Sequence, residues 1–456
     1  MKKILTLLLA LWMLTGCVAM AAGNQLVVGS TTAMSGAFFT DLFGSNTADM
    51  DVRALLHGYN LMSWDHETGT YQINDSVVAG MAVSRDAQNN RVYTFDLYGD
   101  LKFSDGSAIT AKDYAFSILL TASPELAKLG GQSAAVGAIL GMDAYQSGKS
   151  SVLRGVRLLS DTQMSITISK AYEPYFYEMA LFDYSPYPIS VLAPGCKVVD
   201  TEKGVVIVNA DGTGDAIFTA GLLQKTILDA ATGYMSHPSV VSGPYTLTRY
   251  DAQSGTASFA INPYYKGNED GEKPTIETIV YRSVANDEAI DLLLSGEVDL
   301  LNKMVAADTI SKGIQSTANQ PFSVANYPRS GLSMISFSCE RQTVSSKAVR
   351  QAIANCFDRD ALVKAYTGNF GLKANGYFGI GQWMYQLAAG TIQPPVVDLP
   401  ANATAKETAA YEKTVAQWDA LSLDKLKDYP LDLDQAAKLL DQDEWRLGKD
   451  GIRAEK

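Results

Sequence analysis

The stretch from residue 242 to residue 301 constrains the fold of this chain more than any other. It opens with Ser242-Gly243-Pro244-Tyr245, which predicts a turn because glycine and proline interrupt regular structure and proline fixes φ. Two segments of roughly alternating apolar character, 245–250 and 257–261, follow with a second turn between them. This pattern predicts a β-hairpin, and a further strand is expected at 276–281.

A helix and another strand are expected at the end of the same stretch. Four apolar residues recur there at helical spacing: Ala289, Ile290, Leu293 and Leu294. Asn286 can serve as the N-cap, with Asp287 and Glu288 favouring the positive end of the helix dipole. Gly296 ends the helix, and Val298 to Leu301 begins the next strand.

Length and charge limit the classes of protein to consider. The chain has 456 residues, enough for two or three domains, and its 47% hydrophobic and 19% charged content is typical of globular proteins. A formal net charge of -12 disfavours nucleic acid as a partner, because phosphate binding requires basic surface.

The N-terminus carries a targeting segment. Lys2 and Lys3 form a basic region before the apolar run Ile4 to Leu14, which is too short to remain as a membrane-spanning helix. Leu14-Thr15-Gly16-Cys17 then resembles a bacterial lipobox, so Cys17 is the expected lipidation site. The alternative is an ordinary signal peptidase site at Ala19-Met20-Ala21.

Sequence motifs of common enzymes are not complete in this chain. Gly148-Lys149-Ser150 ends like a nucleotide-binding loop, but the first glycine of that motif would have to be residue 143, which is Asp143. His66 has no histidine four positions later, and no serine lies in a GxSxG motif. We therefore expect no catalytic residues, no metal site and no cofactor.

The three cysteines beyond the targeting segment predict no disulfide framework. Cys196, Cys339 and Cys356 are odd in number and widely scattered. Cys339 and Cys356 have apolar neighbours in the sequence, which predicts that they are small core residues.

Several motifs together resemble one protein family. The strings SGPYTLTRY, INPYYKG and NDEAIDLLLSGEVDLL, in this order and spacing, resemble the extracellular solute-binding proteins of the oligopeptide/dipeptide/nickel family, which capture a ligand for an ABC importer. Residues 93–113, with YTFDL, FSDG and TAKD, also resemble the family, as do VRQAIANCFDRDALV at 349–363 and DGIR at 450–453. Glu444 stands where this family usually has glycine.

The resemblance implies an α/β fold of two lobes, with an accessory domain in the first lobe. Residues 1–22 would be the signal segment with its lipobox, 23–59 and 158–329 the first lobe, 60–157 the accessory domain, and 330–456 the second lobe. In the family, further strands follow the DGIR element. We therefore expect the chain to be incomplete, with a second lobe that lacks sheet partners and is prone to aggregation or proteolysis.

The resemblance also implies a function without catalysis. The chain would be a monomer that captures a small solute between its lobes, with a peptide as the favoured ligand, and delivers it to ABC permease subunits. Other solutes, namely an oligosaccharide, a nickel chelate or haem, remain open, as does an extracytoplasmic hydrolase. The protein would be exported and held on the outer face of the cell membrane through lipid on Cys17, or be periplasmic.

Ligand-binding residues of the first lobe are expected in two places. The small, flexible loop Met34-Ser35-Gly36 would close over the ligand, although without the family resemblance a plain connection from strand to helix is favoured. Asn302 matches a family position that faces the cleft.

The second lobe is expected to contribute four residues. Ser333 lies in a predicted strand, 326–338, where the family offers backbone groups to an extended peptide. Tyr377, Phe378 and Trp383 could line side-chain pockets, with ordinary core packing as the alternative.

Overall fold

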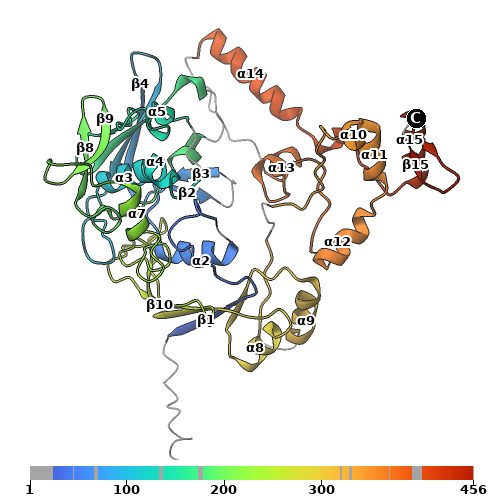
Figure 1. Cartoon of the computed structure of the whole chain (residues 1–456), viewed down its shortest axis with the longest axis horizontal. Helices are drawn as coiled ribbons and strands as arrows, with labels where there is room; N and C mark the ends of the chain where they lie inside the picture. Colours follow the sequence, from blue (N-terminus) through green and yellow to red (C-terminus); the bar gives the residue numbers. More distant parts are fainter. Residues whose placement is uncertain are drawn as a thin grey trace, which may run out of the picture. The chain divides into compact units, whose positions relative to one another are not determined.

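The chain divides into two compact units. The computed structural model describes residues 24–44, 46–65, 70–132, 137–172, 178–318, 321–327, 331–368, 370–392 and 403–454. The first unit is Met1–Trp64 with Tyr71–Lys303, and the second is Asp65–Thr70 with Met304–Lys456 (Figure 1). The domain boundaries expected from the sequence stay a prediction.

A five-stranded mixed sheet forms one layer of the first unit. Its strands, in spatial order, are β10 (Tyr245–Asp251), β11 (Thr256–Ile261), β12 (Thr278–Ser283), β1 (Gln25–Ser30) and β13 (Leu300–Asn302). The strand β1 runs parallel to both of its neighbours, whereas β11 is antiparallel to its neighbours β10 and β12. The hairpin and the two later strands predicted for residues 242–301 are thereby confirmed.

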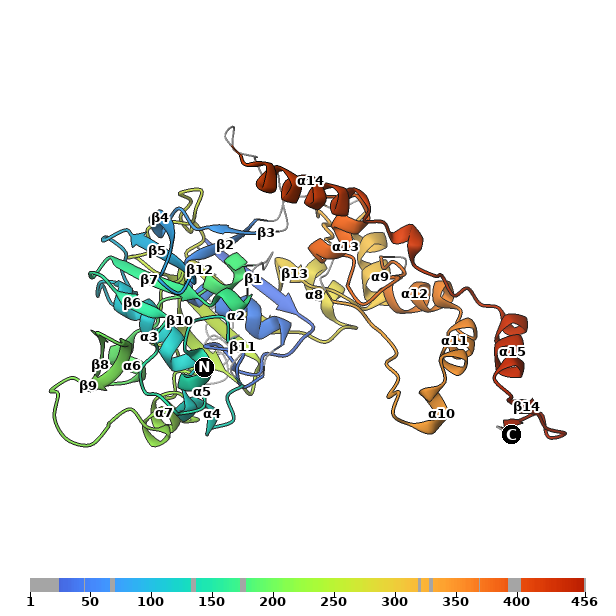
Figure 2. The same cartoon turned by 90° about the horizontal axis from the view of Figure 1, so that it is seen from above.

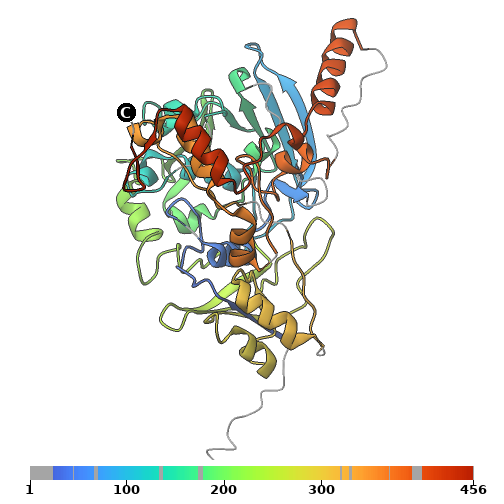
Figure 3. The ribbon, with the colours of Figure 1, turned by 90° about the vertical axis from the view of Figure 1, so that its right-hand side faces the viewer.

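Helices cover both faces of this sheet. α2 (Thr47–Leu56) lies on one face and α8 (Ala289–Ser295) on the other (Figures 1 and 3). Val52 and Leu56 of α2 are fully buried against Phe259 of β11 in one hydrophobic core.

The predicted start of α8 is wrong in one detail. Its N-cap is Glu288, without a side-chain cap, and residues 286–288 form a turn. The Ala289 N–H already donates to the carbonyl of Ala285 at 3.0 Å, so this donor needs no side-chain acceptor. Gly296 ends the helix as expected.

A second, larger core surrounds a four-stranded antiparallel sheet of order β4-β5-β7-β6 (Figure 2). The strands are β4 (Val78–Arg85), β5 (Arg91–Leu97), β7 (Gln163–Ile168) and β6 (Val156–Leu158). The nearly wholly buried helix α3 (Ala111–Thr121) begins at the predicted N-cap Thr110, whose backbone N–H and hydroxyl both donate to Asp113. This core runs from Phe39 to Tyr234 along the chain.

Short elements complete the first unit. They are β2 (Met62–Asp65), β3 (Thr70–Ile73), α4 (Pro124–Ala127), α5 (Met142–Gln146), η1 (Lys170–Tyr172), η2 (Glu178–Phe182), α6 (Ile189–Leu192), β8 (Cys196–Thr201), β9 (Gly204–Asn209) and α7 (Ala220–Thr226).

The second unit is mainly helical over its described residues. It contains α9 (Ala307–Thr317), α10 (Gln342–Ser345), α11 (Lys347–Asn355), α12 (Arg359–Thr367), α13 (Trp383–Ala388), α14 (Ala405–Asp419), η3 (Leu423–Lys425), α15 (Leu433–Gln442) and the hairpin of β14 (Arg446–Leu447) with β15 (Arg453–Ala454). Helices α11 and α15 lie against each other, and the buried apolar residues among the described ones of this unit are Val349 and Ala352 of α11 and Ala436 of α15.

Two predictions for the second unit are wrong. Residues 321–327 and 331–338 form no strand, and Met334 and Ile335 are 55% and 59% exposed. A strand requires partners for its backbone groups, and no described strand pairs with this segment. Cys339 and Cys356 are exposed rather than core residues, because one follows this unpaired segment and the other lies at the end of α11.

Gly243 shows why the stretch from residue 242 to residue 301 needs glycine at its first turn. Its N–H donates to the Leu56 carbonyl at 2.8 Å, and an added Cβ would lie 2.5 Å from the Leu56 carbonyl carbon. We expect Gly243→Ala to destabilise the protein by about 1–3 kcal/mol, because the end of α2 must shift to admit a methyl group.

Urea unfolding of the full chain measures this effect. Gly221→Ala is the matched control, since the nearest atom to its added Cβ is 3.8 Å away and α7 favours alanine. Equal stability of the two variants would contradict the steric argument.

Candidate functional site

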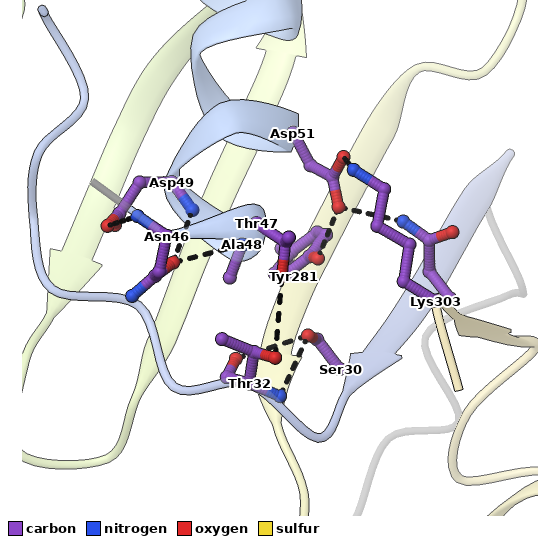
Figure 4. A network of polar contacts seen from close by, with 10 residues as sticks. Ser30, Thr32, Asn46, Thr47, Ala48, Asp49, Asp51, Tyr281 and Lys303 are labelled. Atoms are coloured by element: carbon purple, nitrogen blue, oxygen red, sulfur yellow. Dashed lines mark hydrogen bonds and ion pairs between the residues drawn. The ribbon is translucent and has the colours of Figure 1, made fainter. Parts of the chain in front are cut away.

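The candidate site lies at the carboxyl ends of the parallel strands β12, β1 and β13. In open α/β sheets, ligands bind in the crevice outside these strand ends. Asp51 of α2 reaches this edge, where it accepts hydrogen bonds from the Tyr281 hydroxyl and the Asn302 amide, each at 2.8 Å, and pairs with Lys303 (Figure 4). We call Asp51, Tyr281, Asn302 and Lys303 the Asp51 cluster.

Strand register brings the cluster together. Tyr281 lies beside Val28, and Asn302 lies beside Ser30, the last residue of β1. Lys303 follows directly with a left-handed backbone, φ 56°, which is uncommon for a residue other than glycine. The Lys303 side chain pairs with Asp51. The helix α2, the strand β12 and the end of β13 therefore meet at one carboxylate.

Burial strengthens the preference of the Tyr281 hydroxyl for its protonated form. Tyr281 is only 3% exposed, and this burial raises the pKa of its hydroxyl, with the Asp51 carboxylate adding to the rise. The hydroxyl therefore stays protonated at neutral pH and acts as the donor to Asp51. The Asp51 cluster is thus one acceptor surrounded by three donors.

The predicted loop at residues 34–36 is fastened to α2. Asp49, which is fully buried, accepts hydrogen bonds from the Ser35 N–H at 2.8 Å, the Ser35 hydroxyl at 2.6 Å and the Gly36 N–H at 3.2 Å. Gly36 has a φ of 86°, which a residue with a side chain rarely adopts. Met34 is 8% exposed and packs in the core with α2.

A hollow of about 550 Å³ opens beside this loop. It is lined by Ser35, Gly36, Ala37, Phe43, Gly44, Asn46, Leu228, Asp229, Ala230, Met235 and Ser236. The lining therefore combines polar and apolar groups around a space large enough for a side chain of a ligand.

The remaining predicted residues lie in the second unit. Ser333 is exposed within the segment that forms no strand. Tyr377 and Phe378 contact each other edge to face, with ring centroids 6.0 Å apart, and are 71% and 42% exposed. Trp383 is the first residue of α13. A ligand-binding role for all eight predicted residues stays a prediction.

Sequence reasoning missed Asp51, Tyr281, Lys303 and Asp49. Asp49 and Asp51 stand two positions apart at the start of a helix, so their side chains leave it in different directions. Asp49 accepts hydrogen bonds from the loop at residues 34–36. Asp51 accepts hydrogen bonds from Tyr281 of β12 and Asn302 of β13. The available signal was two carboxylates near a helix start that follows a strand and a small-residue loop.

Two observations concern other kinds of site. Within the described ranges, no group of three or more His, Cys, Asp or Glu side chains could hold a metal ion. In the same ranges, no helix combines the length and apolar character needed to cross a membrane. Cys17 and the rest of the predicted signal segment lie outside the described residues.

Comparison with known sequences places this chain near peptide-binding proteins. Residues 76–456 match the family described as bacterial extracellular solute-binding proteins, family 5, middle part. The chain is 25% identical over 384 residues to the oligopeptide-binding protein OppA of Lactococcus lactis subsp. lactis (strain IL1403), which covers 81% of this chain and 52% of OppA. The chain therefore spans about half the length of that relative.

Solved structures share the fold. Lactococcal OppA, complexed with an endogenous peptide in the closed conformation, matches with a TM-score of 0.62 and 18% identity, over 95% of this chain and 69% of OppA. NikZ from Campylobacter jejuni in complex with Ni(L-His) matches with a TM-score of 0.57 and 14% identity, over 95% of this chain and 66% of NikZ. These matches confirm the predicted fold class, the α/β fold of two-lobed periplasmic binding proteins.

Proposed function

This chain belongs to family 5 of the bacterial extracellular solute-binding proteins, and we propose that it captures a peptide for an ABC importer. The family match over residues 76–456 carries the proposal, and the oligopeptide-binding relatives favour a peptide over other solutes. The ligand bridges the two lobes, and the closed protein docks on permease subunits. Closure is favoured only by contacts that the ligand makes with both lobes.

We propose that the protein binds its ligand without transforming it and acts as a monomer. The family and the matched relatives are binding proteins. A turnover assay with chromogenic peptides and glycosides tests this point. Release of chromophore above that of heat-denatured protein would favour the hydrolase alternative.

Asn302 is the first-lobe residue proposed to contact the peptide. Its side chain lies at the carboxyl edge of β13, half-buried and oriented by Asp51. We expect Asn302→Ala to weaken peptide binding roughly five- to 150-fold, which corresponds to about 1–3 kcal/mol for a buried partner left without its hydrogen bond.

Calorimetry with a peptide library on the whole protein tests both the function and this residue. Gln224→Ala, an exposed change on α7, is the matched control. Unchanged affinity in Asn302→Ala removes this residue from the site. Binding of an oligosaccharide, a nickel chelate or haem, with no peptide binding, overturns the peptide proposal and leaves the capture mechanism.

A lipid anchor at Cys17 is proposed from the lipobox alone. One lipidated cysteine attaches a protein to a membrane without a spanning helix. We expect Cys17→Ala to move the protein from the membrane fraction to the soluble fraction, whereas the exposed Cys339→Ala leaves it in place. Retention of Cys17→Ala in the membrane fraction would exclude this anchor.

A further inference from the structure

The two ends of the Asn302 amide differ in chemistry, and its neighbours decide which end faces them. An amide has an N–H₂ donor end and a carbonyl acceptor end, whereas a carboxylate offers acceptors alone. Because Asn302 contacts the Asp51 carboxylate at 2.8 Å, the amide nitrogen must face Asp51. The carbonyl oxygen, Oδ1, is therefore directed away from α2.

The carboxylate of Asp51 is itself held in place. The buried Tyr281 hydroxyl donates to Oδ2, the oxygen that also receives Asn302, and the Lys303 ammonium pairs with Oδ1. Rotation of the carboxylate would break these contacts. The orientation of Asn302 is thus determined by α2, β12 and the end of β13 together.

The outward oxygen of Asn302 is available to a ligand. Among the residues that the structure describes, no hydrogen bond engages Asn302 Oδ1, although the amide nitrogen of the same side chain is paired. The side chain is half-buried at the carboxyl edge of β13, beside the end of β1. A carbonyl oxygen has two acceptor sites, so Asn302 Oδ1 can accept a hydrogen bond from a donor of the ligand at this edge.

We infer that Asp51 is a positioning residue for ligand specificity, which presents the Asn302 carbonyl oxygen to a main-chain N–H of the bound peptide. This inference rests on the proposed function. It adds one requirement to that function: the ligand must carry a hydrogen-bond donor opposite Asn302 Oδ1. A ligand with an ether or ester oxygen there would place two acceptors against each other.

An amide-to-ester scan tests the inference. The probes are an alanine pentapeptide and its four analogues in which one peptide N–H is replaced by an ester oxygen, titrated calorimetrically into the full-length protein. For the unmodified protein, we expect that an ester at one of the four positions lowers the affinity at least tenfold. In Asp51→Asn, the amide at position 51 can face Asn302 with either end, so the fall at that position should be threefold or less.

Controls separate positioning from stability. Tyr245→Phe removes a tyrosine hydroxyl from the same sheet, where it donates to the Ile276 carbonyl at 2.9 Å, and leaves the Asp51 cluster intact, so it should keep the tenfold discrimination. All titrations are run below the melting temperature of each variant, determined by circular dichroism, and Asp51→Ala gives a second test of lost orientation. A structural role alone would change affinity for all five probes by the same factor.

Each outcome is decisive. If the unmodified protein binds the peptides but shows no tenfold position, or if Asp51→Asn keeps the discrimination, the inference is overturned and peptide capture stands. If no probe and no longer peptide binds, the proposed function fails, and this inference fails with it.

Discussion

Asp51→Ala is expected to lower the free energy of unfolding by about 3 kcal/mol. The change leaves the buried Tyr281 hydroxyl without its acceptor and removes the partners of Asn302 and Lys303. A buried donor left unpaired costs roughly 1–3 kcal/mol. The ion pair adds less than a buried pair would, because the side chains of Lys303 and Asp51 are 31% and 20% exposed.

Urea unfolding of the whole chain, followed by circular dichroism, measures this loss. Lys303→Met isolates the ion pair and should cost no more than about 1 kcal/mol. If Asp51→Ala is no less stable than Lys303→Met, the hydrogen bonds to Asp51 contribute nothing, and the Asp51 cluster does not hold the strand ends.

Acidification below pH 6.5 is expected to destabilise the protein through His57. The imidazole lies among Phe39, Tyr187 and Tyr234, with ring centroids 5.9–6.3 Å away, and burial lowers its pKa to about 4. The ring is neutral in the folded protein and its Nε2–H donates to the Phe38 carbonyl at 2.9 Å.

The sign of the effect follows from proton uptake. Between pH 6.5 and 4, the unfolded chain protonates His57 while the folded protein does not, so stability falls as the pH falls. The stabilisation is fully present above pH 6.5. A shift of about 2.5 pH units corresponds to roughly 3 kcal/mol lost by pH 4.

The comparison with His57→Gln isolates this contribution. Glutamine keeps an N–H donor for the Phe38 carbonyl but does not titrate, so the stability difference between the two proteins should change by roughly 3 kcal/mol across this range. Asp113 acts in the opposite direction, because burial raises its pKa to about 6, but it is present in both proteins and cancels. Parallel pH profiles for the two proteins would show that His57 is not held neutral.

The order and type of elements in residues 242–301 could be predicted from the sequence. Apolar alternation, helical spacing and the turn residues act over a few positions, and the structure places β10, β11, β12, α8 and β13 where these patterns indicate. The N-cap of α3 at Thr110 is equally local. The motif strings of the same regions were specific enough to indicate the family, which the match over residues 76–456 confirmed.

The tertiary structure alone decided which side chains meet. Asp51 contacts residues 230 and 251 positions away, and no local pattern links a helix start to those strand ends. The same reason explains the two errors in the second unit: residues 331–338 have strand-like apolar character, and Cys356 has apolar neighbours, but pairing and burial depend on what packs against them. Periodicity is a property of the chain, whereas a hydrogen-bond partner or a buried face exists only once distant segments have come together.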